Sequence, residues 1–444
     1  KCRVSISKQL GVYSSRADGH TRSNMSWSCP EAIHSIASSP SRGSHKAPKC
    51  NRSRGLALHC VAALAICSGL TLSTSFSSFT GASRQSKPCV RSARARPSLR
   101  AGVPLQAAFD GPLAQLAGLT TLSIDTGDLD VIAEWAETGS ISDATTNPLF
   151  VAQAGLSGDP RFIAMVDDAV AFAKASDLEG EERLNLAMDR LSVNLGSEIS
   201  KLVKGYISTE VDIRESFDTE ASVARARRII KMYEELGVPR SRVLIKLAAT
   251  WEGIKAAEIL EKEGITCNLT LLFGFAQGVA CGHAGVRLIS PFPGRVLDWY
   301  KQKDNVQGYE PQEDPGVVVV RRIFEYYKKY GHDTIVMPAS WRPSRGAGYE
   351  LDEILALAGV DRMTIPPPLL EKVKALSEPV EQVLDASKAI KDCNDSEIKA
   401  EELNEKAFRM MMNADVCATA KLAEGINAFV AETQKLREAL QAKF

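Results

Sequence analysis

Residues 243–272 read Val243-Leu-Ile-Lys-Leu-Ala-Ala-Thr-Trp-Glu-Gly-Ile-Lys-Ala-Ala-Glu-Ile-Leu-Glu-Lys-Glu-Gly-Ile-Thr-Cys-Asn-Leu-Thr-Leu-Leu272. The two ends of this stretch are short apolar runs, and its middle repeats apolar residues at helical spacing. We therefore predict a strand over Val243–Leu247, a helix over Gly253–Glu263 and a strand over Thr266–Leu272. This order is typical of the βαβ unit of parallel sheets.

The same alternation continues outward in both directions. Eight apolar runs are predicted strands: Thr121–Asp125, Ser142–Thr146, Tyr206–Val211, Val243–Leu247, Thr266–Leu272, Val286–Ser290, Thr334–Met337 and Arg362–Ile365. Further predicted helices are Pro160–Ala175, Glu220–Leu236, Phe275–Gly282 and Gly316–Tyr330. Eight such units in residues 108–444 favour a (β/α)8 TIM barrel of the α/β class, with an open doubly wound sheet as the alternative. Residues 371–444, including the amphipathic stretch Ala418–Leu440, are expected to add C-terminal helices outside the barrel.

The formal charge of zero hides two oppositely charged regions. Residues 1–100 contain 16 of the 54 basic side chains but only 2 of the 54 acidic ones, so the rest of the chain is strongly acidic. An acidic body has no general electrostatic attraction for nucleic acid, and none is expected as a partner. Any anion that the body binds must be held by local groups.

Residues 1–107 are predicted to be a targeting leader and to lie outside the folded domain of residues 108–444. The apolar run Leu56–Leu72 follows Arg52 and Arg54, as the apolar core of a signal peptide follows its basic start. The next segment is hydroxylated, basic and free of acidic residues, like a transit peptide. Together they resemble the bipartite leader of algae whose plastids lie behind extra membranes, so we expect a plastid protein that has no membrane segment once mature. A membrane anchor or a cytoplasmic location is the alternative.

Several site types lack their sequence signatures. The chain has no C-x-x-C, H-E-x-x-H, Walker A or complete G-x-G-x-x-G motif. After residue 107 only His283 and His332 supply imidazoles. Zinc ribbons, metalloproteases, P-loop nucleotidases and standard dinucleotide enzymes are therefore disfavoured, and we expect neither a metal nor a cofactor.

Unusual polar residues stand at the ends of predicted strands, where TIM barrels carry their chemistry. Lys246 interrupts an apolar strand; it could be a lysine that reaches solvent, or an amine nucleophile made reactive by burial, which disfavours the charged form. Asp125 and Glu210 end two other strands and could be caps or general acid/base groups. Asp128 and Asp212 better fit a capping or supporting role.

Two further groups of polar residues could bind a ligand. Asn147 ends the second predicted strand, and Asn268 and Thr270 share one face of the fifth, as hydrogen-bonding groups for a polyhydroxy ligand would. A satisfied polar layer in the core is the alternative. Arg295 and the pair Ser340 and Arg342 follow late strands, where barrels often bind phosphate, although surface arginines are common.

These stretches, taken together, resemble the transaldolase family. The resemblance rests on five motifs in the same order, from about Leu116 to the C-terminus: Asp143–Pro148, Ile207–Asp212, Val243–Gly253, Cys267–Phe273 and Leu288–Arg295. It implies a cofactor-free (β/α)8 barrel, often a homodimer. It also implies transfer of a dihydroxyacetone unit from sedoheptulose 7-phosphate or fructose 6-phosphate to glyceraldehyde 3-phosphate or erythrose 4-phosphate, in the pentose phosphate pathway.

The resemblance also implies roles for individual residues. Lys246 would be the Schiff-base lysine, Glu210 an acid/base acting with a water that Thr270 helps to hold, and Asp125 the group that assists carbon–carbon cleavage. The implied substrate-binding residues are Asn147, Asn268, Ser290, Phe292, Arg295, Ser340 and Arg342. An aldolase that releases free dihydroxyacetone, or a catalytically silent sugar-phosphate-binding barrel, remains the alternative. The Pro343–Tyr349 loop is longer than the family pattern.

Overall fold

A computed structural model describes residues 111–444, and the predicted leader lies outside them. The described residues contain eight parallel strands in the order β7-β6-β5-β4-β3-β2-β1-β8. Their bounds are β1 Thr121–Asp125, β2 Ile141–Thr145, β3 Ile207–Glu210, β4 Val243–Ala248, β5 Cys267–Leu272, β6 Leu288–Pro291, β7 Ile335–Val336 and β8 Arg362–Ile365. Each predicted strand is present, with its ends displaced by a few residues at most.

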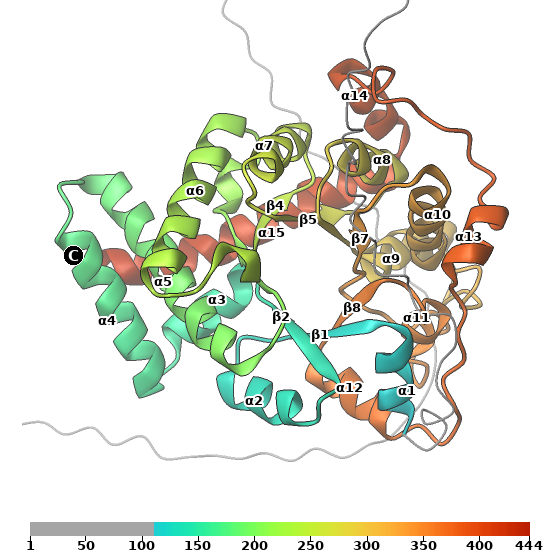
Figure 1. Ribbon diagram of the computed structural model, residues 1–444, viewed down its shortest axis with the longest axis horizontal. Helices are drawn as coiled ribbons and strands as arrows, with labels where there is room; N and C mark the ends of the chain where they lie inside the picture. Colours follow the sequence, from blue (N-terminus) through green and yellow to red (C-terminus); the bar gives the residue numbers. More distant parts are fainter. Residues whose placement is uncertain (1–110) are drawn as a thin grey trace, which may run out of the picture. The chain divides into compact units, whose positions relative to one another are not determined.

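Helices separate the strands and surround them (Figure 1). Between β1 and β8 the longer ones are α2 Leu129–Glu137, α3 Pro148–Leu156, α4 Pro160–Lys174, α5 Gly180–Leu202, α6 Thr219–Glu235, α7 Trp251–Lys262, α8 Phe275–His283, α9 Pro293–Asp304 and α10 Pro315–Tyr330. Shorter helical segments are α1 Pro112–Leu119, η2 Ile213–Glu215, η3 Arg240–Arg242 and α11 Asp352–Ala356. Helix α5 was not predicted from the sequence, because its buried side includes charged residues that disturb its apolar periodicity.

The strands form a nearly closed barrel, so the TIM-barrel prediction is confirmed over the open sheet. No ladder joins β7 to β8, but the backbone N–H of Thr364 donates to the carbonyl of Pro338 across the junction at 3.2 Å. Side chains also meet inside the ring: the Ser123 hydroxyl of β1 lies 3.5 Å from the Met337 sulfur beyond β7. Closure brings the carboxyl ends of all the strands to one rim.

Four helices follow the barrel strands, as the pattern of residues 371–444 predicts. They are α12 Pro367–Lys374, α13 Ala386–Asp392, α14 Glu405–Ala414 and α15 Val416–Gln441. The last does more than cover the exterior, because α15 packs against α3, β5, η2 and α9. Three of these elements directly follow strands, so α15 lies beside the rim where the strands end. Among the described helices, none is long and apolar enough to cross a membrane.

Candidate active site

Lys246 lies inside the barrel near the carboxyl end of β4. Every residue of this strand is buried, and the parallel register pairs Lys246 with Glu210 of β3 and Asn268 of β5. Its Nζ donates a hydrogen bond to the Thr146 carbonyl at 3.1 Å and lies 3.6 Å from Glu210 Oε2. The side chain is 7% exposed, so it does not reach bulk solvent. The alternative of a lysine that reaches solvent is therefore wrong, and the side chain ends inside the barrel beside Glu210.

Glu210 is a buried acid whose ionisation is shifted by its surroundings. Burial raises the pKa of its carboxyl to about 7, and the nearby positive charge of Lys246 only partly opposes this. The Glu210 side chain is only 4% exposed, yet neither of its carboxylate oxygens has a hydrogen-bond partner among the described residues. Unsatisfied buried oxygens are rare in folded proteins and are common at reactive sites.

Asp125 ends β1 and is a second, partly buried carboxyl whose ionisation responds to the charge of Lys246. Burial raises its pKa, while the charge of Lys246 and a hydrogen bond from Thr145 lower it. The Thr145 hydroxyl donates to Asp125 Oδ1 at 2.8 Å and lies 2.6 Å from the Thr364 hydroxyl. Thr145 was not predicted as a partner of Asp125, although it lies within the Asp143–Pro148 motif.

Polar residues of β3, β5 and β6 form a chain of hydrogen bonds inside the barrel. Asn268 is fully buried; its Nδ2 donates to the Ser208 hydroxyl at 3.3 Å, and its Oδ1 accepts from Ser290 at 2.8 Å. Thr270 is buried on the same strand, and its hydroxyl has no partner among the described residues. Asn268 therefore faces the interior, as predicted, and the free hydroxyl of Thr270 is available to a ligand or water.

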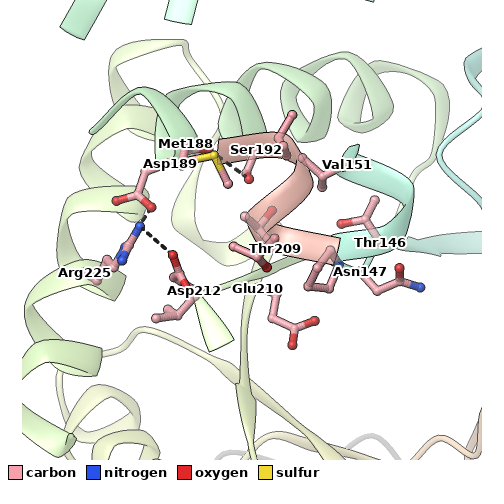
Figure 2. A pocket seen from close by; sticks show the side chains of 14 residues that line it. Thr146, Asn147, Val151, Met188, Asp189, Ser192, Thr209, Glu210, Asp212 and Arg225 are labelled. Carbon is pink, nitrogen blue, oxygen red and sulfur yellow. Dashed lines mark hydrogen bonds and ion pairs between the residues drawn. The ribbon is translucent and has the colours of Figure 1, made fainter. Parts of the chain in front are cut away.

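Asn147 lies two residues after β2 and is the N-cap residue of α3. Its Oδ1 accepts a hydrogen bond from the Phe150 backbone N–H at 3.1 Å, so this oxygen caps the helix. The capping contact leaves the amide nitrogen for another partner. Figure 2 shows the Glu210 and Asn147 side chains directed away from a separate group of charged residues, Asp189, Asp212 and Arg225.

Arg295 and Phe292 follow β6, at the start of α9. Phe292 is buried and packs edge-on against Phe273, with the ring centres 5.6 Å apart. The Arg295 guanidinium lies 5.0 Å from the Phe292 ring centre and 5.9 Å from that of Phe429 in α15. Burial and the charge of Arg342 lower the pKa of Arg295. Two neighbouring guanidinium groups make this side of the rim suited to an anion.

The segment that carries Ser340 and Arg342 is tightly shaped. Ser340 adopts a φ of 64°, in the left-handed region, and Trp341 Nε1 donates to the Thr364 carbonyl at 2.7 Å. The Arg342 N–H donates to Glu353 Oε2 at 2.6 Å, and Glu353 is fully buried. Gly294 must lack a side chain, because a Cβ there would lie 2.3 Å from the Ser340 carbonyl oxygen.

The Arg342 side chain is 42% exposed and already has a carboxylate partner. Its Nε donates to Asp298 Oδ2 at 3.1 Å, and its Nη1 donates to the Trp341 carbonyl at 2.9 Å. The long loop after it is fixed separately, since Ser344 donates to the Asp314 carboxylate and Arg345 pairs with Asp352. Neither Asp298 nor Glu353 was predicted as a partner of Arg342, because acidic residues in helices usually face solvent and give no local sign of such a contact.

Asp128 and Asp212 are capping residues, as predicted. The Asp128 carboxylate accepts from the backbone N–H groups of Asp130 and Val131 at the start of α2. Asp212 accepts from the Arg214 N–H and joins a buried ionic cluster with Asp189 and Arg225. Within residues 111–444, no three His, Cys, Asp or Glu side chains are grouped so that they could hold a metal ion.

Comparisons with known proteins relate this chain to enzymes of one kind. Residues 122–440 match the family described as Transaldolase/Fructose-6-phosphate aldolase. A transaldolase of Alteromonas mediterranea is 49% identical over 331 residues, which cover 74% of this chain and 98% of that protein. Transaldolase 1 of Pectobacterium atrosepticum is 48% identical over 331 residues, covering 74% and 99%. A transaldolase of Methylobacillus flagellatus is 49% identical over 329 residues, covering 74% and 98%.

Proposed function

Because the chain belongs to the transaldolase/fructose-6-phosphate aldolase family, we propose that it is a transaldolase. It transfers a dihydroxyacetone unit from fructose 6-phosphate or sedoheptulose 7-phosphate to erythrose 4-phosphate or glyceraldehyde 3-phosphate. The observation that carries this proposal is a buried amine, Lys246, 3.6 Å from a carboxyl of Glu210 whose pKa is raised to about 7. An amine beside a proton-exchanging acid is what Schiff-base chemistry requires.

The first step is addition of the Lys246 amine to the C2 ketone of the donor. The resulting carbinolamine loses its hydroxyl as water when Glu210 supplies a proton, and a Schiff base forms between Nζ and C2. A pKa near 7 allows Glu210 to give this proton and later take it back at neutral pH. The unpartnered Thr270 hydroxyl is assigned to hold the water that carries the proton.

The second step breaks the C3–C4 bond of the donor. Asp125 takes the proton of the C4 hydroxyl, C4 becomes the carbonyl carbon of the departing aldose phosphate, and the bond electrons move to the protonated Schiff base. The product on Lys246 is an enamine of dihydroxyacetone. This carbon nucleophile attacks the aldehyde of the acceptor, and the same steps in reverse release the new ketose phosphate. Asp125 suits the base role because its carboxyl lies within the electrostatic influence of Lys246.

We assign substrate binding to two sets of residues at the rim, one for the sugar hydroxyls and one for the phosphate. Asn147, Asn268 and Ser290 would orient the hydroxyls of the sugar. The two guanidinium groups of Arg295 and Arg342 would hold the phosphate together with Ser340, and the low exposure of Phe292 supports its role as an apolar wall. That wall hinders water from protonating the enamine, which favours transfer over release of free dihydroxyacetone.

Borohydride trapping tests the reaction directly. The purified enzyme is mixed with fructose 6-phosphate and borohydride, and the modified peptide is expected to carry a reduced dihydroxyacetone adduct on Lys246. A second assay adds erythrose 4-phosphate and measures sedoheptulose 7-phosphate against free dihydroxyacetone. Release of dihydroxyacetone without transfer would identify an aldolase instead, and absence of any adduct would indicate a silent binding barrel.

We also propose that the protein is imported into a plastid and acts as a homodimer. The first rests on the signal-like and transit-like segments of the sequence, and a reporter fused to residues 25–110 that stays in the cytosol of a suitable alga would contradict it. Exposed apolar side chains on α14 and α15 support the second, among them Met410 and Val416 at 61% and 62% exposure. Sedimentation of the wild type and of Met410→Lys tests whether this face joins two copies.

A further inference from the structure

Gln277, in the first turn of α8, is a buried amide with four backbone partners. Its Nε2 donates to the carbonyls of Ala249 and Leu271 at 2.9 and 3.0 Å. Its Oε1 accepts from the N–H groups of Phe273 and Gly274 at 2.9 and 3.1 Å. The residue is fully buried, so water cannot replace any of these bonds. One side chain thus joins the end of β4, the end of β5 and the start of α8.

The backbone that Gln277 holds is irregular. The pairing of β5 with β6 shifts by one residue between Leu269 and Leu272, which marks a β-bulge. Within the bulge, Leu271 adopts a φ of 52°, in the left-handed region that a branched side chain seldom occupies. Such a conformation persists only where surrounding contacts impose it, and the Leu271 carbonyl is one of the two that Gln277 binds.

The side chain of Leu271 is fixed from the opposite direction by α15. It packs on Gly425, where an added Cβ would lie 2.7 Å from Leu271 Cδ2. Gln277 and Gly425 therefore constrain the same bulge, one through its peptide groups and the other through a side-chain contact. In Figure 1, α15 passes behind the ends of β4 and β5.

The bulge sits directly beside two elements of the site. Thr270, with its unpartnered hydroxyl, is the residue before Leu271, and its carbonyl accepts from the Ala249 N–H at 2.8 Å. The Ala249 carbonyl in turn accepts a hydrogen bond from Gln277. Ala249 directly follows β4 and lies three residues after Lys246. A displacement of this junction would move the Thr270 hydroxyl while leaving the middle of β4 in place.

We propose that Gln277 is a positioning residue: by clamping the Leu271 bulge, it aims the Thr270 hydroxyl at the water and proton that pass between Glu210 and the Lys246 adduct. The inference rests on the proposed function, since it deepens the role of Thr270 there. Gln277 touches no substrate atom, and its effect is on proton transfer. Phosphate binding, which lies on the β6 and β7 side, is unaffected.

The test compares Gln277→Glu with Asn194→Asp. Gln277→Glu keeps the shape of the side chain and an oxygen that accepts from the N–H groups of Phe273 and Gly274. It cannot donate to both the Ala249 and the Leu271 carbonyls. Asn194 is a matched control: it is a buried amide on α5 that donates to the Met165 carbonyl and to Asp168, away from the proposed catalytic residues. For Gln277→Glu, kcat should fall about tenfold or more, since small misplacements of aligned groups cost that much, and KM for fructose 6-phosphate should stay within about threefold.

Trapping identifies the step that is lost. In the folded Gln277→Glu enzyme, borohydride should still capture an adduct on Lys246, but the adduct should form more slowly and the pH dependence of kcat should change. Asn194→Asp should lower thermal stability and leave kcat per folded molecule unchanged. Equal losses of kcat in both variants would overturn the proposal, because the effect would then be general destabilisation.

Gly425→Ala acts on the same bulge from the α15 side and keeps the test decisive if Gln277→Glu fails to fold. Alanine favours the helix, and its methyl group pushes on Leu271, so kcat should fall about threefold with KM unchanged. Wild-type kcat in Gly425→Ala would contradict the inference where Gln277→Glu does not fold. Wild-type kcat in a folded Gln277→Glu enzyme would contradict it directly. If the wild-type chain itself does not transfer dihydroxyacetone, it is the proposed function that fails.

Discussion

Two carboxylates separated by one residue, Glu210 and Asp212, have opposite environments. Both are nearly inaccessible, with side-chain exposures of 4% and 3%. Glu210 faces the barrel interior, where Lys246 is the one cation within ion-pair distance among the described residues, and its pKa rises to about 7. For Asp212, burial would raise the pKa, but a hydrogen bond from Arg214 and the charge of Arg225 hold it below its usual range.

The difference shows that burial alone does not make an acid reactive. Asp212 contacts the three guanidinium groups of Arg214, Arg225 and Arg437, and Arg225 also binds Asp189 at 2.9 Å (Figure 2). A carboxylate that is fully paired stays ionised and fixes η2 and α15 to the barrel. Glu210 keeps two oxygens without hydrogen bonds, and this unsatisfied state makes its proton available. The number of hydrogen-bond and ion-pair partners therefore separates the proposed catalytic acid, Glu210, from the structural carboxylate, Asp212.

Replacing the amine should have the largest effect. Lys246→Arg keeps a positive charge beside Glu210 but cannot form a Schiff base. We expect transfer to fall by at least about a thousandfold, as it does when enzymes lose a nucleophile. The measurement is transfer from fructose 6-phosphate to erythrose 4-phosphate, with circular dichroism as the control for folding. Substantial turnover in this variant would reject Lys246 as the nucleophile.

Glu210→Gln should come next. The amide cannot exchange a proton, so kcat should fall about a hundredfold or more. In the wild type, kcat/KM should show an ionisation near pH 7, and this ionisation should be absent from the variant. A profile that keeps the same ionisation in Glu210→Gln would assign it to another group.

The raised pKa of Glu210 also predicts how stability depends on pH. The folded pKa lies above the unfolded value, so the stability contributed by the proton is fully present below about pH 4.5 and is lost as pH rises through about 7. The free energy of unfolding of the wild type should therefore fall more steeply between pH 5 and pH 8 than that of Glu210→Gln, as urea titrations at the two pH values can measure.

Asp212→Asn should have the opposite effect to Glu210→Gln, because it should lower the free energy of unfolding and leave turnover nearly unchanged. Removing one member of a buried ionic cluster leaves arginines without full compensation and costs up to about 3–5 kcal/mol of unfolding free energy. Turnover per folded molecule should stay within about twofold of the wild type, because Glu210 and Lys246 are untouched. A loss of kcat as large as that of Glu210→Gln would mean that the two carboxylates act as one unit.

Arg342→Ala should have the smallest effect in free energy, because this arginine is partly exposed and shares the anion site with Arg295. Loss of a charge-assisted hydrogen bond should lower kcat/KM for fructose 6-phosphate about tenfold. Dihydroxyacetone as donor should lose much less, since it has no phosphate. Equal losses with both donors would show that Arg342 supports the loop instead, and Arg295→Ala would then be the variant that isolates phosphate binding.

The sequence by itself determined the barrel and its principal polar residues. Short apolar runs alternate along the chain with segments of helical spacing, and this alternation predicts all eight strands. It is visible in the sequence because each strand and helix must bury its own apolar side chains. Lys246 could also be recognised from the local sequence, since a lysine is rarely buried within an apolar strand unless it is paired. The long helix α5 was not predicted, because its buried face carries Asp189 and Arg190 and lacks a simple apolar stripe.

Only the tertiary structure decided which polar residues pair and which stay unsatisfied. Gln277 and Glu353 lie in helical segments where polar residues are ordinarily solvated, and nothing in the local sequence marks them as buried. Their partners include backbone groups of neighbouring elements, the Ala249 carbonyl after β4 for Gln277 and the Arg342 N–H of the loop after β7 for Glu353, which meet them only in the folded barrel. The same holds for Glu210 and Asp212: the pKa of each depends on dielectric surroundings and neighbouring charges in three dimensions, and local sequence carries neither.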